Sequence, residues 1–183
     1  MLRAARRYFE RGRSMRMSFI ATVITASLAA ISIASAGDLP HPDGPVVLTV
    51  SGSISNTNGD GAARFDMGTL EAMAGRSATM ETPWTEGATR FDGPFLREIL
   101  AAVGAKGGTL RFVALNDYAS DIPSADATDL DTILATHMNG KPMSVREKGP
   151  LFLIYPFDQS ADLYNEKYFS RSVWQVKEIK VIE

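Results

Sequence analysis

The sequence predicts an α+β fold with a mixed β-sheet, barrel-like core and short helices, because strand and helix patterns both occur but do not alternate regularly. Residues 173–182 alternate apolar and polar side chains as a strand does, with one slip at Lys177-Glu178 that indicates a β-bulge. Residues 95–103 place apolar side chains four residues apart, as an amphipathic helix does. A regular strand–helix alternation, typical of a parallel α/β sheet, is missing from the pattern.

The N-terminal segment has the layout of a secretory signal peptide. Residues 1–36 contain six arginines, then an apolar run over 19–33, then the small residues Ala-Ser-Ala ending at Ala36. This apolar run is shorter than the roughly 20 residues of a spanning helix. We therefore expect cleavage near Ala36 and a periplasmic location, with an uncleaved membrane anchor as the alternative. An extended lead-in over 37–45 and a single domain over 46–183 should follow.

Charge and cysteine content exclude several classes of function. Residues 1–36 carry six arginines and one glutamate, which leaves 13 basic and 20 acidic side chains in 37–183, a formal charge of −7. An acidic domain of this kind is not expected to bind nucleic acid or an anionic membrane surface. The chain has no cysteine, so it forms no disulfide and offers no thiolate to a metal.

The first half of the domain begins with a strand and a capped helix. Residues 46–52 are apolar and predict a strand, and the Asn-Gly-Asp-Gly run at 58–61 predicts a surface turn rather than a calcium loop, because no glutamate closes a ligand set. Asp66 should cap a short helix over 66–74. A strand is expected over 77–82.

Turn residues then separate two further elements. The run Pro-Trp-Thr-Glu-Gly at 83–87 predicts a turn, and Phe-Asp-Gly-Pro at 91–94 predicts another interruption. An amphipathic helix over 95–103 should end at Gly104, a residue type that favours helix C-termini.

The stretch from Leu110 to Pro123 is the one around which we expect the fold to be organised. Its apolar start predicts a buried strand, and this strand ends in the polar cluster Asn116, Asp117 and Tyr118. A buried strand that delivers an amide, a carboxylate and a phenol into one turn is a plausible wall of a ligand pocket.

The second half contains the most apolar run of the domain. Residues 125–131 are acidic and predict a loop, and 130–137 fit either a short helix or a strand. The apolar run at 151–156 predicts a central strand, and 164–168 is a polar segment with a tyrosine at each end. In the final strand the alternation predicts that Trp174 lies in the core.

The order of these motifs resembles a known family. A strand ending in glycine and a short helix are followed by TPWTEG at 82–87 and FDGPFLREIL at 91–100. ALNDY at 114–118, KGPLFLIYP at 148–156 and the closing W-x-V strand complete the series. Together they resemble the molybdopterin-binding domain of the sulfite oxidase superfamily, in its small exported form. The resemblance covers nearly all of 46–183 and implies the sulfite oxidase-type molybdopterin-binding fold.

The resemblance also implies a ligand and a partner. Catalytic members of the superfamily hold molybdenum through one cysteine thiolate, expected here near Thr79 to Thr82, where this chain has none. Oxygen-atom transfer is therefore not expected, nor is molybdenum. The cysteine-less branch resembles this chain better: periplasmic proteins that bind a pterin and dock on the periplasmic domain of a membrane-bound cyclic-di-GMP enzyme or sensor. A molybdopterin-dependent oxidoreductase without the cysteine, or a ligand-free interaction scaffold, are the alternatives.

Candidate pterin ligands lie first around Trp84. A pterin is a flat bicycle that needs an aromatic face, polar groups for its amino-pyrimidinone edge and apolar walls. Trp84 follows a strand within a turn, so it either stacks on the ligand or packs against the core. Glu86 or Glu81 could pair with the donor edge, or be solvated surface charges. Thr82 stands roughly where the cysteine is missing, and its hydroxyl could bond a ligand.

The remaining candidates belong to the Asn116–Tyr118 cluster and to a basic segment. Asn116 and Asp117 either contact the ligand or cap their own turn, and Tyr118 should be partly buried with its hydroxyl directed at a partner. Arg146, with Lys148, either holds a ligand or partner or is solvated. The two histidines of the chain lie far apart in sequence, which is not the spacing of a metal or catalytic site.

Overall fold

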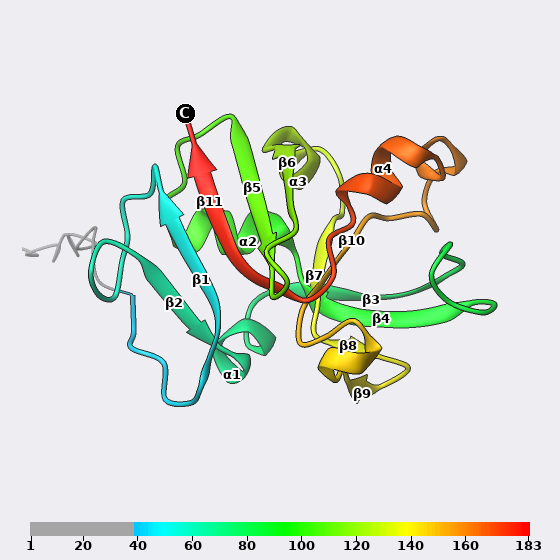
Figure 1. The fold of residues 1–183 in the computed structure, drawn as a ribbon, viewed down its shortest axis with the longest axis horizontal. Helices are drawn as coiled ribbons and strands as arrows, with labels where there is room; N and C mark the ends of the chain where they lie inside the picture. Colours follow the sequence, from blue (N-terminus) through cyan, green and yellow to red (C-terminus); the bar gives the residue numbers. More distant parts are fainter. Residues whose placement is uncertain (1–38) are drawn as a thin grey trace, which may run out of the picture. The chain divides into compact units, whose positions relative to one another are not determined.

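The computed structural model describes residues 39–183. The predicted signal peptide over 1–36 lies outside the described residues. Within the described part, three β-sheets and a few short helices confirm the predicted α+β class (Figure 1). The sheets are open and do not close into a barrel, so the core is less barrel-like than expected. No helix within 39–183 is both long and apolar enough to cross a bilayer.

The largest sheet has five strands and holds the core of the domain. Its strand order is β2 (Ala63–Asp66), β1 (Val46–Gly52), β11 (Val176–Ile182), β5 (Thr109–Ala114) and β6 (Ala119–Pro123). β1 and β11 run parallel, and the other neighbours are antiparallel. The register shifts between Val176 and Glu178, which confirms the predicted bulge. The stretch 110–123 is a complete β5–β6 hairpin, whereas the sequence suggested only one strand and a turn.

One face of this sheet is sealed by helix α2 (Leu96–Ala102), which lies behind it in Figure 1. Leu96 and Ile99 of α2 are fully buried and belong to the same hydrophobic core as Phe112 of β5 and Ile179 of β11. Period-two alternation puts every second strand residue on this face, where the buried side chains of α2 join the core.

A second sheet contains a strand that the sequence did not reveal. Its order is β3 (Gly75–Met80), β4 (Thr89–Pro94), β8 (His137–Met138) and β9 (Lys141–Pro142). The prediction of an interruption at 91–94 is wrong, because these residues complete β4. A Cβ at Gly93 would collide with the Leu134 carbonyl, and one at Gly75 with the Gly93 carbonyl. The glycines here serve close backbone approach rather than a turn.

The third sheet pairs β7 (Ile133–Ala135) with β10 (Phe152–Ile154), and all six residues are buried. Within the segment 130–137, residues 133–135 therefore form a strand, His137 begins β8 and no residue is helical. The run at 151–156 does form a strand, but it is not central in the large sheet: it pairs with β7 and makes one isolated bridge to Trp174.

The short helices agree only in part with those predicted from the sequence. Asp66 caps α1 (Met67–Glu71) as predicted, and its Oδ1 accepts a 2.8 Å bond from the Thr69 amide. Hydrogen bonds from Thr69 and Gly44 lower the pKa of Asp66 to about 2. The predicted loop at 125–131 instead begins with α3 (Ala125–Thr128). The polar segment at 164–168 leads into α4 (Glu166–Arg171), and two 3-10 turns lie at Val145–Glu147 and Ala161–Leu163.

Candidate functional site

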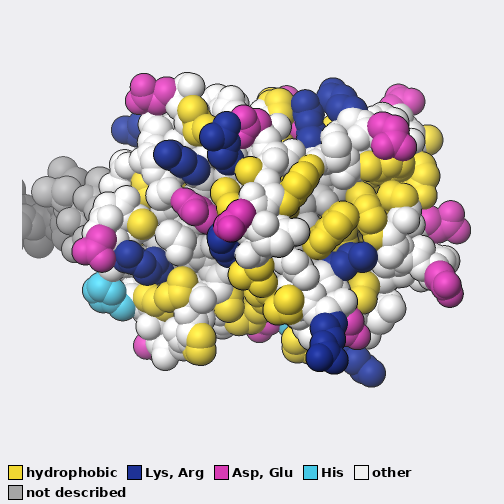
Figure 2. Space-filling view, viewed as in Figure 1, with side chains coloured by type: hydrophobic (Ala, Val, Ile, Leu, Met, Phe, Trp, Pro, Cys, Tyr) yellow, Lys and Arg dark blue, Asp and Glu magenta, His cyan; other side chains and the backbone are white. Residues whose placement is uncertain are grey.

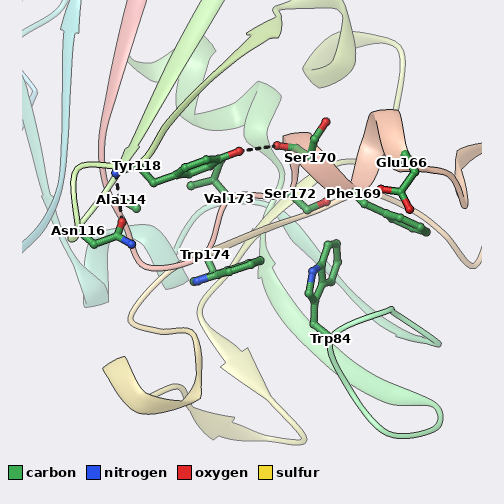
Figure 3. Close-up of a pocket in the computed structure, with 10 residues that line it drawn as sticks. All are labelled: Trp84, Ala114, Asn116, Tyr118, Glu166, Phe169, Ser170, Ser172, Val173 and Trp174. Atoms are coloured by element: carbon green, nitrogen blue, oxygen red, sulfur yellow. Dashed lines mark hydrogen bonds between the residues drawn. The ribbon is translucent and has the colours of Figure 1, made fainter.

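A pocket of about 390 Å³ opens where the β5–β6 turn, the turn after β3 and the chain from α4 to β11 meet (Figure 3). Its size falls within the range of small-molecule sites. Four aromatic rings and a few polar groups line it: Trp84, Ala114, Asn116, Tyr118, Glu166, Phe169, Ser170, Ser172, Val173 and Trp174. The pocket therefore joins the two stretches singled out in the sequence, TPWTEG and ALNDY, which lie about 30 residues apart.

The β5–β6 turn presents Asn116 and Tyr118 to the pocket. Asn116 Oδ1 accepts a 3.1 Å bond from the Tyr118 amide, so the side chain caps its own turn while also lining the pocket. Asp117 adopts a left-handed backbone conformation, with φ of 64°. Its carboxylate does not line the pocket and instead meets Lys177 Nζ at 2.7 Å, a hydrogen bond and ion pair that lower the pKa of Asp117.

Tyr118 connects this turn to α4. Its hydroxyl donates to the Ser170 carbonyl at 3.3 Å, and the Ser120 hydroxyl donates to the same oxygen at the same distance. The expectation of a hydrogen-bond partner is confirmed. The side chain is more open than expected, however, since 50% of Tyr118 is exposed. An exposed ring held by its hydroxyl offers a fixed face to a ligand.

Trp174 lies in the pocket wall, so the prediction that it belongs to the core is wrong: it is 39% exposed. Gln175 has a φ of 56°, which breaks the extended backbone just before β11 and turns Trp174 outward. Val173 takes the buried place instead, with 2% exposure. Lys148 Nζ lies over the ring of Trp174, 5.1 Å from its centroid, in a cation–π contact.

Trp84 packs against other rings and also lines the pocket, so the packing alternative is observed and stacking on a ligand stays a prediction. Its ring meets Phe152 edge-on at 5.4 Å between centroids, Phe169 at 5.8 Å and Trp174 at 6.1 Å. Phe152 is completely buried. The core thus holds one edge of Trp84 while the rest of the ring remains in the pocket wall (Figure 3).

The other predicted ligand residues lie outside the pocket lining. Thr82 is buried under the turn, where its hydroxyl bonds the Thr85 hydroxyl at 2.8 Å and helps to shape the loop that carries Trp84. Glu86 and Glu81 are exposed at this loop. Arg146 is exposed in the 3-10 turn Val145–Glu147. Of the residues predicted to bind the ligand, the pocket therefore brings together Trp84, Asn116 and Tyr118.

Helix α4 supplies pocket residues that the sequence argument missed, Glu166, Phe169 and Ser170. Asn165 caps the helix by accepting a 2.9 Å bond from the Lys167 amide. The available signal was Asn165 directly before Glu166, since Asn is a strong helix N-cap and an acidic residue is favoured in the first turn.

The far end of α4 is held by a partly buried ion pair. Arg171 Nη1 lies 2.7 Å from Asp126 Oδ2, and the Tyr155 hydroxyl donates to the same carboxylate at 2.7 Å. Burial and this hydrogen bond raise the pKa of Tyr155. The network links α4 to α3 and to the chain after β10, so the C-terminal end of α4 is anchored to the rest of the domain.

The donor set suits a pterin better than molybdenum. The chain contains no cysteine, the protein ligand that molybdenum takes in the superfamily that the motifs resemble. The pocket instead offers aromatic faces, the Asn116 amide and the Glu166 carboxylate, which are the groups that a flat, hydrogen-bonding heterocycle requires.

Comparison with known proteins agrees with the motif order. The model of the family described as oxidoreductase molybdopterin binding domain matches residues 64–183. The matched range contains every residue that lines the pocket. No match was found among curated proteins.

Proposed function

The chain belongs to the oxidoreductase molybdopterin-binding domain family, and from this membership we propose that it is a non-catalytic periplasmic protein that binds a pterin and reports it to a membrane signalling partner. The observation that carries the proposal is an aromatic, hydrogen-bonding pocket within a family built around a pterin cofactor, in a chain without the metal-ligating cysteine.

The proposed ligand lies between aromatic side chains. In Figure 3 the rings of Tyr118 and Trp174 lie across the pocket from one another, and Trp84 stands beside them. A bicyclic pterin placed between the first two rings would be covered on both faces, and Trp84 would close one side. Each such stacking contact contributes about 1–3 kcal/mol by alanine substitution. The Asn116 amide would add one hydrogen bond at the edge.

The absence of a thiolate supports a binding role over oxygen-atom transfer. Without cysteine, the protein supplies no soft ligand to complete the coordination of molybdenum held by a dithiolene. The hydroxyl of Thr82, near the expected ligand position, already bonds Thr85 and is buried below the pocket loop.

The proposed partner is the periplasmic domain of a membrane-bound cyclic-di-GMP enzyme or sensor, as the family resemblance implies. A groove beside the pocket supports a docking role, and its wall includes the exposed apolar side chains of Val46, Leu115 and Val145. Leu115 precedes Asn116 in the same turn, so one turn borders both the groove and the pocket. Figure 2 shows hydrophobic side chains gathered beside α4 and between α4 and β5, where the aromatic pocket lies.

The proposal is tested by analysing protein purified from a bacterial periplasm. After denaturation, the supernatant is assayed for pterin fluorescence, and molybdenum is measured on the same sample. Stoichiometric pterin without molybdenum is the expected result. Pterin with stoichiometric molybdenum would instead favour a cofactor-dependent oxidoreductase. No pterin, together with no rebinding of added pterin, would favour a ligand-free interaction scaffold.

A further inference from the structure

Glu166 is the sole charged side chain among the described residues that line the pocket. The side chain is exposed at the pocket rim, and within 39–183 its carboxylate has no hydrogen bond and no ion pair, so that a ligand in the pocket can reach it. A carboxylate at an aromatic pocket has two acceptor oxygens and no donor. Its natural partner is therefore a ligand edge that presents N–H groups.

The position of Glu166 is defined by α4. It is the first residue of that helix, and Phe169, three residues later, lies on the same side and also lines the pocket. The helix is held by the Asn165 cap at its start and by the Arg171–Asp126 pair at its end. The carboxylate is thus carried on an anchored element at the pocket edge, beside the ring that Trp84 contacts.

We infer that Glu166 is the specificity-determining residue of the pocket, and that it binds the 2-amino-pyrimidinone edge of a pterin through two parallel N–H···O bonds. This inference rests on the proposed function. In a pterin the 2-amino group and the neighbouring ring N–H form two adjacent donors, which match the two oxygens of one carboxylate. Bonds of this charge-assisted, paired kind fix the orientation as well as adding affinity.

The same geometry orients the rest of the ligand. In Figure 3 Glu166 lies beside Phe169 at one end of the pocket and Asn116 lies at the other end, with Trp84, Tyr118 and Trp174 between these ends. A pterin whose donor edge lies at Glu166 directs its pyrazine ring past Trp84, toward Tyr118, Trp174 and the Asn116 end. The pocket should therefore select heterocycles by this edge and tolerate change at the other end.

Lumazine tests the inference, because it is the same bicycle with a carbonyl in place of the 2-amino group. A site built to bond a donor discriminates strongly against an analogue that lacks it. Binding of pterin and of lumazine is measured at neutral pH by fluorescence titration of refolded, ligand-free protein. The unsubstituted protein and the variants Glu166→Gln and Glu86→Gln are compared. Glu86 is the matched control, since it is an exposed carboxylate beside Trp84 that does not line the pocket.

We expect the unsubstituted protein to bind pterin roughly 10- to 100-fold more tightly than lumazine, because the lost bond is made to a charged group. Glu166→Gln should weaken pterin by a similar factor and leave lumazine nearly unchanged, and Glu86→Gln should alter neither. Equal binding of the two heterocycles by the unsubstituted protein would overturn the role of Glu166 while leaving pterin binding intact. A Glu166→Gln variant that still prefers pterin over lumazine by the same factor would also overturn the role of Glu166 and leave pterin binding intact. Failure to bind either heterocycle would overturn the proposed function and this inference together.

Discussion

The five-stranded sheet and the aromatic cluster beside it are both apolar, but they exclude water to different degrees. In the sheet, Leu48, Val50, Phe112 and Ile179 are all completely buried. The aromatic cluster, by contrast, runs from full burial to the surface: Phe152 0%, Phe157 9%, Trp174 39% and Tyr164 45% exposed, with Trp84 and Phe169 between.

The difference shows how one set of side chains can pack and still bind. Rings in the cluster meet mostly edge to face, as Trp84 does with Phe169 at an interplanar angle of 80°. An edge-on contact leaves the face of one ring free, whereas interdigitated aliphatic side chains leave no free surface. The sheet should therefore determine stability, and the cluster should determine ligand binding at a small cost in stability.

The largest expected effect lies in the sheet. Phe112→Ala removes a completely buried ring and should lower the free energy of unfolding by about 3–5 kcal/mol. Val113→Ala, at the half-buried neighbour, should cost about 1 kcal/mol or less. Urea unfolding measures both. Equal losses at the two positions would contradict the view that one face of β5 carries the core.

The anchor of α4 should couple stability to binding. Asp126→Asn leaves Arg171 without its carboxylate and should cost about 1–3 kcal/mol, less than a fully buried pair would, because the two side chains keep some contact with solvent. Amide hydrogen exchange in α4 and pterin affinity should change together. Asp131→Asn, which breaks a more exposed pair with Arg97, is the control and should cost under about 1 kcal/mol. Unprotected α4 amides in the unsubstituted protein would refute the anchor.

Trp174→Ala should separate binding from stability. We expect pterin affinity to fall roughly 10- to 100-fold, since a stacked base-like ring contributes about 1–3 kcal/mol. The free energy of unfolding should fall by about 1 kcal/mol or less, because Trp174 is partly exposed. Trp84→Ala should lower both quantities, and Tyr164→Ala, an exposed ring outside the pocket lining, should leave affinity unchanged. Unchanged affinity in both tryptophan variants would rule out this aromatic pocket as the pterin site.

The smallest effect concerns acid stability at the Asp66 cap. Its pKa is about 2 in the folded state, below the ordinary value of 3.8, because the Thr69 and Gly44 amides bond its charged form. As the pH falls, Asp66 is therefore protonated in the unfolded chain before it is protonated in the folded protein. Its contribution to the free energy of unfolding is complete above about pH 4 and is lost as the pH falls toward 2. Asp66→Asn should flatten this part of a pH-dependent unfolding curve, and Asp60→Asn should not. An identical slope in all three proteins would show that the cap has no such role.

Local patterns were predictable where a few neighbouring residues decide the structure. The bounds of β1, the Asp66 cap, the turn after β3 and the bulge near Lys177 all follow from short-range chemistry. Strand β4 was missed because a glycine can mark either a turn or a close approach between two backbones. At Gly93 only the nearby Leu134 carbonyl in the tertiary structure shows that close approach is the reason. Only Trp84, Asn116 and Tyr118 of the predicted ligand residues line the pocket, since the sequence marks polar turn residues but not the direction of their side chains.

By itself the sequence determined the α+β class, the lack of any thiolate ligand and the resemblance to the family whose model matches 64–183. These depend on composition, periodicity and motif order, which are properties of the chain alone. Tertiary structure alone decided that Trp174 faces a pocket and that Glu166 joins Trp84 and Asn116 there. One left-handed residue, Gln175, turns a strand residue outward, and the docking of α4 adds a carboxylate from about 80 residues beyond Trp84. Neither event leaves a periodic trace in the sequence, because each depends on contacts between segments far apart in the chain.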